Sequence, residues 1–347
     1  MRLRVRRPDD WHLHLRDGTE LAAVLAFTAK RFARAVVMPN LRPPVTTVAA
    51  AAAYRDRILA ALPQGLAFEP LMTLYLTDRT SPDEVRRASE SGIVIGIKLY
   101  PAGATTNSQS GVTRIEHVYP ALEAMQECDV VLQVHGEVTT ADVDVFDRER
   151  EFIDRVLGPL SERFPSLRIV FEHVTTRAAV AFVRGARAGI AATITPQHLL
   201  LNRNAIFAGG IRPHHYCLPV LKREQDRVAL LDAATSEDAR FFLGTDSAPH
   251  ARHTKETACG CAGVFSAHAG IELYAEAFDE AGRLDRLEAF ASERGADFYR
   301  LPRNEERITL ERAAWSPPDS YPYGEHRIVP FRAGETVNWR LVEDAEG

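Results

Sequence analysis

Short β-rich runs alternate with longer stretches rich in Ala, Arg and Glu along most of the chain, and this alternation constrains the fold more than any other feature. The short runs have the length and residue types of buried strands, and the longer stretches have those of helices. Strands are expected at residues 12–14, 35–38, 68–75, 93–98, 130–134, 167–171, 190–194 and 241–244. Helices are expected at residues 20–33, 47–62, 82–91, 119–128, 149–164, 176–188 and 222–235. Eight strands that alternate with helices favour an α/β fold, a (β/α)8 TIM barrel, over an open sheet.

Two segments depart from this rhythm. Residues 101–112 form a loop rich in Gly, Thr, Asn and Ser that is too polar for the core. Residues 302–347 are rich in Pro, and we expect them to form an irregular C-terminal layer packed on the outside of the barrel. The sequence contains no internal repeat and no linker, so a single domain is expected over residues 1–347.

Composition narrows the class of protein. Hydrophobic residues make up 46% of the chain, which is ample for a core. A net charge of −5 and a pI near 6.2 argue against a partner that is nucleic acid or a membrane surface. The basic run 2–7 has no apolar stretch after it and is not a signal peptide. No apolar run approaches 18 residues, so no membrane span is expected. Four cysteines fit a reducing cytoplasm better than a disulfide framework.

His12 and His14 stand two residues apart at the end of the first expected strand. Alternate side chains of a strand point to the same face, so the two imidazoles lie about 6–7 Å apart along the chain and can bind one metal ion. Arg16 continues the same face and carries a cationic fork suited to a carboxylate. A His-x-His pair on its own is more often an ordinary strand feature, so the other strand ends must decide.

Four further expected strands end in a side chain that can bind a metal ion or carry a proton. These are Lys98, His135, His173 and Asp246. The C-terminal ends of barrel strands meet at one rim, which holds the active site in this fold. Each residue alone has a structural explanation, such as a lysine that reaches solvent or an aspartate that caps a helix. Together with the two histidines of the first strand, they predict a metal site.

This set of side chains indicates two metal ions. Imidazole and carboxylate suit zinc and similar divalent ions. The set exceeds what one tetrahedral ion with an open position needs, so two ions with a bridging hydroxide are expected. The ammonium of Lys98 cannot lie between two cations, but a desolvated, neutral amine can add carbon dioxide to give N6-carboxylysine, an anionic bridging ligand. A Schiff base is the alternative for a barrel lysine, but it leaves the four histidines without a function.

The motifs around these positions resemble those of the dihydroorotases of the amidohydrolase superfamily, in the compact class found in bacteria. The resemblance runs from Asp9 to about Gly270, with a weaker similarity at residues 329–339, and residues 304–327 do not share it. Its motifs are Asp-Trp-His-Leu-His-Leu-Arg-Asp at 10–17, Met-Pro-Asn at 38–40, Gly-Ile-Lys-Leu-Tyr-Pro-Ala at 96–102, His-Gly-Glu at 135–137, Glu-His at 172–173, Cys-Leu-Pro at 217–219 and Gly-Thr-Asp-Ser-Ala-Pro-His at 244–250.

The resemblance implies a role for each residue of the set. The more buried metal ion would be held by His12, His14, Lys98 and Asp246, and the more exposed one by Lys98 as a carbamate, His135 and His173. Asp246 would also be the general base and acid. The substrate would be bound by Arg16, Asn40 and His250 at a carboxylate, by main-chain groups of Leu218 and Ala262 at a ring amide, and by Thr105 and Thr106 as a lid. Zinc is the expected metal.

The activity implied by the resemblance is the reversible cyclisation of N-carbamoyl-L-aspartate to L-dihydroorotate, with loss of water, in de novo pyrimidine biosynthesis. It also implies a cytoplasmic homodimer. One alternative is another cyclic-amide hydrolase, such as a hydantoinase, dihydropyrimidinase or allantoinase. Those enzymes usually carry a β-rich segment ahead of His-x-His, for which the 11 residues before His12 are expected to be too few. The other alternative is a metal-free homologue that serves as a scaffold, against which the complete ligand set speaks.

Overall fold

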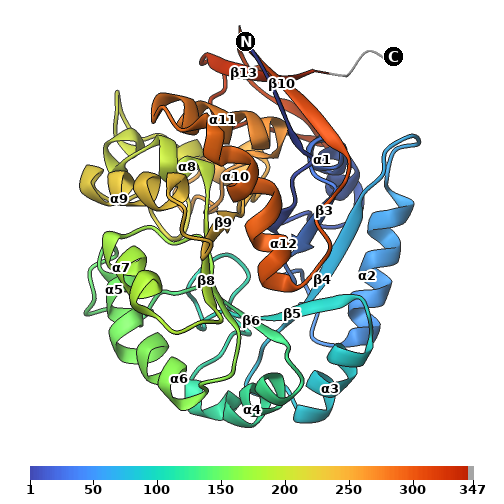
Figure 1. Ribbon diagram of the computed structural model, residues 1–347, viewed down its shortest axis with the longest axis vertical. Helices are drawn as coiled ribbons and strands as arrows, with labels where there is room; N and C mark the ends of the chain where they lie inside the picture. The colour runs from blue at the N-terminus through green and yellow to red at the C-terminus, as the bar shows by residue number, and fades with distance from the viewer. Residues whose placement is uncertain (343–347) are drawn as a thin grey trace.

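The computed structural model describes residues 1–342 and contains a closed barrel. Eight parallel strands lie side by side in sequence order, from β2 to β9 (Figure 1). The first and last strands meet where Leu13 bridges Ser247 and the His14 N–H donates to the Ser247 carbonyl at 2.9 Å. The expected (β/α)8 architecture is confirmed.

The expected strands and helices are present with small differences at their ends. The barrel strands are β2 (Asp10–Leu13), β3 (Arg34–Val37), β4 (Glu69–Tyr75), β5 (Val94–Leu99), β6 (Val131–Val134), β7 (Ile169–Phe171), β8 (Ile190–Ile194) and β9 (Phe241–Leu243). The helices are α1 (Gly18–Arg31), α2 (Val48–Ala60), α3 (Pro82–Glu90), α4 (Tyr119–Glu127), α5 (Arg148–Phe152), α6 (Gly158–Arg163), α7 (Arg177–Gly185), α8 (Pro196–Leu200), α9 (Glu224–Thr235), α10 (Arg252–Lys255), α11 (Gly270–Glu280) and α12 (Arg294–Tyr299).

The helix expected over residues 149–164 is present as one continuous helical path over residues 148–163. The helical path there is divided into α5, a π-helical segment η2 (Ile153–Leu157) and α6. Pro159 has no N–H to continue the α-helical hydrogen bonds, and the chain widens into the π segment just before it.

The interior of the barrel is packed below the rim that carries the predicted site. Trp11 stacks on Tyr299 of α12 with ring centroids 4.7 Å apart, and its ring edge faces Phe242 of β9. The register of β2 against β3 shifts between Asp10 and Leu13, so Trp11 joins this apolar cluster while His12 contacts Asp246. The packing of Trp11 inside the barrel therefore holds β2, the strand that carries His12, in place beneath the metal centre.

The C-terminal region is more regular than expected. Instead of an irregular layer, residues 307–342 contain β10 (Arg307–Trp315), β11 (Tyr321–Tyr323), β12 (His326–Ile328) and β13 (Val337–Val342). Strand β10 pairs antiparallel with both β13 and β1 (Arg2–Arg6), so the basic run at the start of the chain is a strand. Strands β1 and β13, which come from opposite parts of the described chain, flank β10 in this sheet at the top of Figure 1. Strand β13 of this sheet contacts α11.

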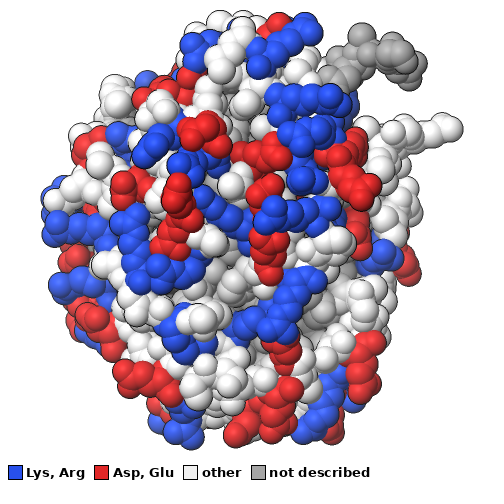
Figure 2. Space-filling view, in the orientation of Figure 1, with Lys and Arg blue, Asp and Glu red and all other residues white. Residues whose placement is uncertain are grey.

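The described surface offers few clues to a partner. On the face shown in Figure 2, Lys and Arg side chains are interspersed with Asp and Glu, without a large area of one sign. Among the residues the structure describes, none of the helices is both long and apolar enough to cross a membrane.

Candidate metal centre

The six side chains predicted from the strand ends come together in the mouth of the barrel. Asp246 Oδ1 lies 3.3 Å from His12 Nε2 and 3.2 Å from His14 Nε2. The His173 ring lies between those of His12 and His135, at centroid distances of 4.9 and 4.8 Å. All six are buried, with exposed fractions of 8% or less. Ligand atoms of His12, His14 and Asp246 lie within 4.8 Å of one another, as do those of His12, Glu172 and His173, and the His135 ring lies beside the second group.

The outer ring nitrogens of three histidines face acceptors. His14 Nδ1 lies 2.8 Å from Asn40 Oδ1, and His135 Nε2 lies 2.8 Å from Glu137 Oε2. His12 Nδ1 lies 3.0 Å from a carboxylate oxygen of Glu172. The hydrogen-bonded acceptors of His14 and His135 place the proton on the outer nitrogen and leave the other nitrogen as a ligand, as in many metal sites.

The charges at the centre favour a bound cation. Burial opposes ionisation of Asp246, but hydrogen bonds from His12 and His14 hold the pKa of its carboxyl well below the usual range. Burial acts to lower the pKa of His12, but the charge of Glu172 and the hydrogen bonds with Asp246 and Glu172 together raise this pKa to about 9. The buried His173 Nδ1 has no hydrogen-bond partner among the described residues. A metal ion bound to the imidazole nitrogens beside Asp246 takes the place of the proton, and imidazole with carboxylate is a donor set that suits divalent ions, so the residues fit the metals.

Lys98 lies at the end of β5, fully buried among these groups. Its Nζ contacts a carboxylate oxygen of Glu172 and lies 4.8 Å from the centroid of the Tyr100 ring. Burial lowers the pKa of the Lys98 amine, against the opposing effect of Glu172. The cost of desolvating the ammonium favours the neutral amine, the form that can react with carbon dioxide.

Three residues of the site adopt a backbone conformation that side chains other than Gly rarely take. The φ angles are 64° for Arg16, 42° for His173 and 45° for Asp246. Such conformations cost about 1–3 kcal/mol each and persist where the surrounding structure enforces them. Their gathering at one rim supports a functional origin.

The cationic pair expected to bind a carboxylate is in place. Arg16 Nη2 lies 3.0 Å from His250 Nε2, and Arg16 Nε donates to the Pro249 carbonyl at 2.9 Å. Since an arginine can only donate, His250 accepts at Nε2. Burial, with the adjacent Arg16, lowers the pKa of His250 well below its usual value. The positive charge of this pair therefore lies on Arg16, and His250 orients the Arg16 guanidinium.

The polar loop lies over the cavity. Asn40 Nδ2 donates to the Thr106 carbonyl at 3.1 Å, and Thr106 Oγ1 donates to the Ala262 carbonyl at 3.4 Å. Thr105, Leu218 and Ala262 line the same cavity as the metal-site histidines. With the loop in this position the cavity leaves about 20 Å³ for the centres of water molecules. The Asn40 amide is thus engaged by His14 and by the loop.

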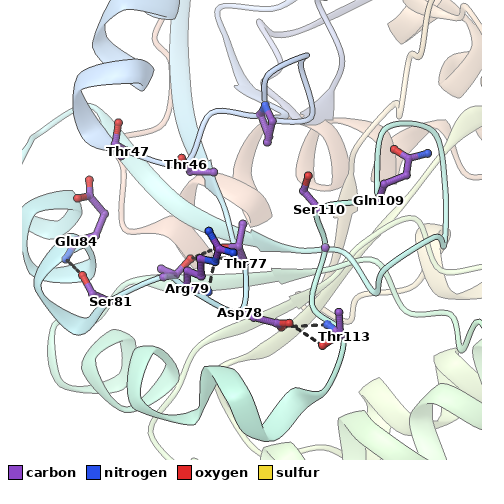
Figure 3. Close-up of a pocket in the computed structure, with 13 residues that line it drawn as sticks. Thr46, Thr47, Thr77, Asp78, Arg79, Ser81, Glu84, Gln109, Ser110 and Thr113 are labelled. Carbon is purple, nitrogen blue, oxygen red and sulfur yellow. Dashed lines mark hydrogen bonds between the residues drawn. The ribbon is translucent and has the colours of Figure 1, made fainter.

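A larger hollow, of about 650 Å³, lies on the other side of this loop. Figure 3 shows its wall of hydroxyl-bearing side chains, including Thr47, Thr77 and Ser81, with Gln109 and Ser110 of the loop opposite them. No His or Cys is among the described residues that line it. The hollow leaves space beside residues 109–113, at the C-terminal end of the loop.

Sequence reasoning missed two acidic residues of the site. Glu172 and Glu137 are fully buried and hold the outer nitrogens of His12 and His135. A carboxylate within an apolar strand, directly before a predicted ligand, is the signal that could have identified Glu172.

The amidohydrolase family model matches residues 10–315, which defines the class to which this barrel and its site belong. A protein named Dihydroorotase from Azoarcus sp. (strain BH72) is 68% identical over 337 residues, covering 97% of this chain and 98% of the relative. Dihydroorotase structures from Campylobacter jejuni (36% identity) and, with 5-fluoroorotic acid, from Saccharomyces cerevisiae (32%) both have a TM-score of 0.90. The match with the Campylobacter jejuni structure covers 99% of this chain and 98% of that one. The match with the Saccharomyces cerevisiae structure covers 98% of each chain. The chain therefore belongs to the amidohydrolase family and, within it, to the dihydroorotases.

Proposed function

We propose that the protein catalyses the reversible ring closure of N-carbamoyl-L-aspartate to L-dihydroorotate, in pyrimidine biosynthesis. The observation that supports this proposal most strongly is that the ring nitrogens of His12 and His14 meet Asp246 in the same cavity as the Arg16–His250 pair. The dihydroorotase relatives, at 62–68% identity, support the same substrate. The hydantoinase alternative is not favoured, since solved hydantoinases and dihydropyrimidinases are 14–17% identical and share the fold alone.

The residues divide the reaction between binding and proton transfer. The metals would be held by His12, His14, Lys98, His135, His173 and Asp246. When bound, two divalent ions, zinc in this proposal, polarise a ring carbonyl and lower the pKa of the attacking water. In the hydrolytic direction Asp246 accepts a proton from that water and delivers it to the leaving ring nitrogen. In the synthetic direction Asp246 takes the proton from the carbamoyl nitrogen as that nitrogen bonds to the side-chain carboxyl carbon, and it returns the proton to the departing oxygen, which leaves as water.

Substrate orientation comes from charge and from main-chain groups. Arg16 binds the ring carboxylate with its fork, and Asn40 and His250 complete that pocket. Main-chain groups of Leu218 and Ala262 meet the ring amide. The loop with Thr105 and Thr106 closes over the substrate and excludes water. Its contacts with Asn40 and Ala262 support this role.

We further propose that the protein is a single-domain cytoplasmic homodimer and that Lys98 carries the carbamate. The resemblance to dihydroorotases supports the dimer and the location. The burial of Lys98 and its lowered pKa support the carbamate.

Metal analysis combined with turnover assays tests the proposed function. We expect two metal equivalents per chain and turnover of dihydroorotate far above that of hydantoin or dihydrouracil. Removal of the metals with a chelator should abolish activity, and zinc should restore it. Preferential turnover of hydantoin would identify the other hydrolase class, and a protein with neither metal nor activity would identify a scaffold.

Asp78 anchors the C-terminal end of the proposed lid loop, residues 101–112, through the residue that follows it. Its carboxylate accepts from the Thr113 N–H at 3.0 Å and from the Thr113 hydroxyl at 2.6 Å (Figure 3). We expect Asp78→Ala to raise KM for dihydroorotate about fivefold. The hydrogen bonds to Thr113 stabilise the ordered loop by about 1 kcal/mol, and without them substrate binding must supply this free energy. Asp83→Ala, an exposed acid at the start of α3, is the control and should keep the wild-type KM. Equal KM values in both variants would show that Asp78 does not hold the lid.

A further inference from the structure

Lys255, at the end of α10, is a buried ammonium that the metal centre does not use. Its side chain lies beneath the loop 256–263, and the residue is 4% exposed. Nζ donates to the carbonyls of Tyr216, Cys261 and Gly263 at 3.1, 2.7 and 2.6 Å. An ammonium has three protons, so main-chain acceptors use all of them.

These carbonyls belong to two segments that form one wall of the substrate cavity. Cys261 and Gly263 flank Ala262, and Tyr216 lies two residues before Leu218. Leu218, Ala262 and Gly263 line the cavity that holds the metal-site histidines. The Gly263 N–H also donates to the Tyr216 carbonyl at 3.0 Å, which joins the two segments directly. Lys255 thus connects both parts of this wall from behind.

The same contacts set the direction of a main-chain donor. The peptide between Cys261 and Ala262 is planar and trans, so its C=O and N–H point in opposite directions. Because the Cys261 carbonyl points at Lys255, the Ala262 N–H points away from Lys255.

The wall has little room to shift. A Cβ atom on Gly263, whose φ is +152°, would lie 2.6 Å from the Ala248 carbonyl oxygen and 2.8 Å from His250 Cδ2. The loop is therefore packed closely against the segment that carries the substrate-binding His250. A small displacement of the loop would change the main-chain groups and the carboxylate pocket together.

We propose that Lys255 is a positioning residue for substrate binding, which holds residues 216–218 and 261–263 so that their main-chain groups meet the ring amide. The inference rests on the proposed function, because it concerns how this site binds its cyclic amide. Lys255 does not touch the substrate and acts through the carbonyls it binds.

The protonation state of Lys255 gives a readout that a purely structural lysine would lack. Burial lowers the pKa of Lys255 to about 8, the Cys217 and Cys261 thiols oppose this shift, and Arg16 adds to it. Burial raises the pKa of Cys217 to about 12, and the lowered pKa of His250 keeps this imidazole neutral, so neither group changes its charge near pH 8. Above pH 8 the neutral amine has two donors for three carbonyls, so the wall loosens and KM should rise.

The first test compares two buried lysines in the metal-loaded protein. We expect Lys255→Met to raise KM for dihydroorotate about tenfold while kcat and metal content change much less. Lys222→Met is the matched control, since Lys222 is also 4% exposed but donates to the Val220 carbonyl, outside the cavity lining. A wild-type KM in folded Lys255→Met would overturn the inference.

The second test is the pH dependence of KM. The wild-type KM should rise above about pH 8, and the rise should persist in Cys261→Ser, which keeps the carbonyl but removes the thiol. Lys255→Met should lack this rise. If Lys255→Met does not fold, the wild-type and Cys261→Ser profiles decide, and a flat wild-type profile overturns the inference. A wild-type protein inactive on dihydroorotate would refute the proposed function, whereas active wild type with an unaltered Lys255→Met would refute this inference alone.

Discussion

Asp246→Asn is expected to lower turnover of dihydroorotate by about 10³-fold or more while the protein stays folded. The asparagine keeps the shape of the side chain and one oxygen for a metal, and it can still face His12 and His14. It cannot accept the proton of the attacking water, because its amide nitrogen is not basic and its carbonyl is only weakly so. The loss should appear in kcat in both directions, since the same group gives and takes the proton.

Three measurements separate the chemistry of Asp246 from its structural contribution. Metal content and thermal unfolding show whether the centre and the fold persist. Asp238→Asn is the matched control, because Asp238 pairs with Arg240 away from the cavity lining, and it should keep wild-type kcat. Near wild-type activity in Asp246→Asn would remove the general-base role and leave Asp246 as a ligand.

The barrel could be predicted because its signals are local. Each strand is a short apolar run, and several of the following helices begin with a capping side chain, such as Thr47 or Ser81. The site followed from the same rule, since parallel strands deliver their last residues to one rim. His135 and His173 come from different strands, yet their rings lie 4.8 Å apart for this reason.

The parts that escaped prediction depend on distant or side-chain contacts. Arg2 pairs with Glu311 across the sheet that joins the two ends of the chain, and no local pattern announces such a partner. Asn40 was expected to bind substrate, but where its amide bonds go depends on the three-dimensional approach of His14 and of the loop. The register shift between β2 and β3, beside which Trp11 packs in the barrel and His12 contacts Asp246, likewise depends on tertiary structure.

Lys98→Ala is expected to lower turnover by about three orders of magnitude, or about 4 kcal/mol in the barrier. The variant removes the proposed bridging ligand of the metal pair, and the charge stabilisation that the metals provide is worth several kcal/mol. Metal content should fall with activity. Carbon-13 NMR of wild-type protein grown with labelled bicarbonate should show a carbamate signal that the variant lacks. Lys222→Ala removes another buried lysine and should keep activity.

Rescue by a short carboxylic acid distinguishes two roles of Lys98. If Lys98 acts only as the ammonium partner of Glu172, its loss leaves a buried carboxylate without that contact, and an added carboxylate brings a second negative charge to the same place. Acetate or propionate would then depress activity further or leave it unchanged. If Lys98 serves as a carbamate, the added acid supplies the missing bridging oxygens and should restore part of the turnover in a saturable manner. Because the two roles predict opposite responses to the same anion, the sign of the change decides between them.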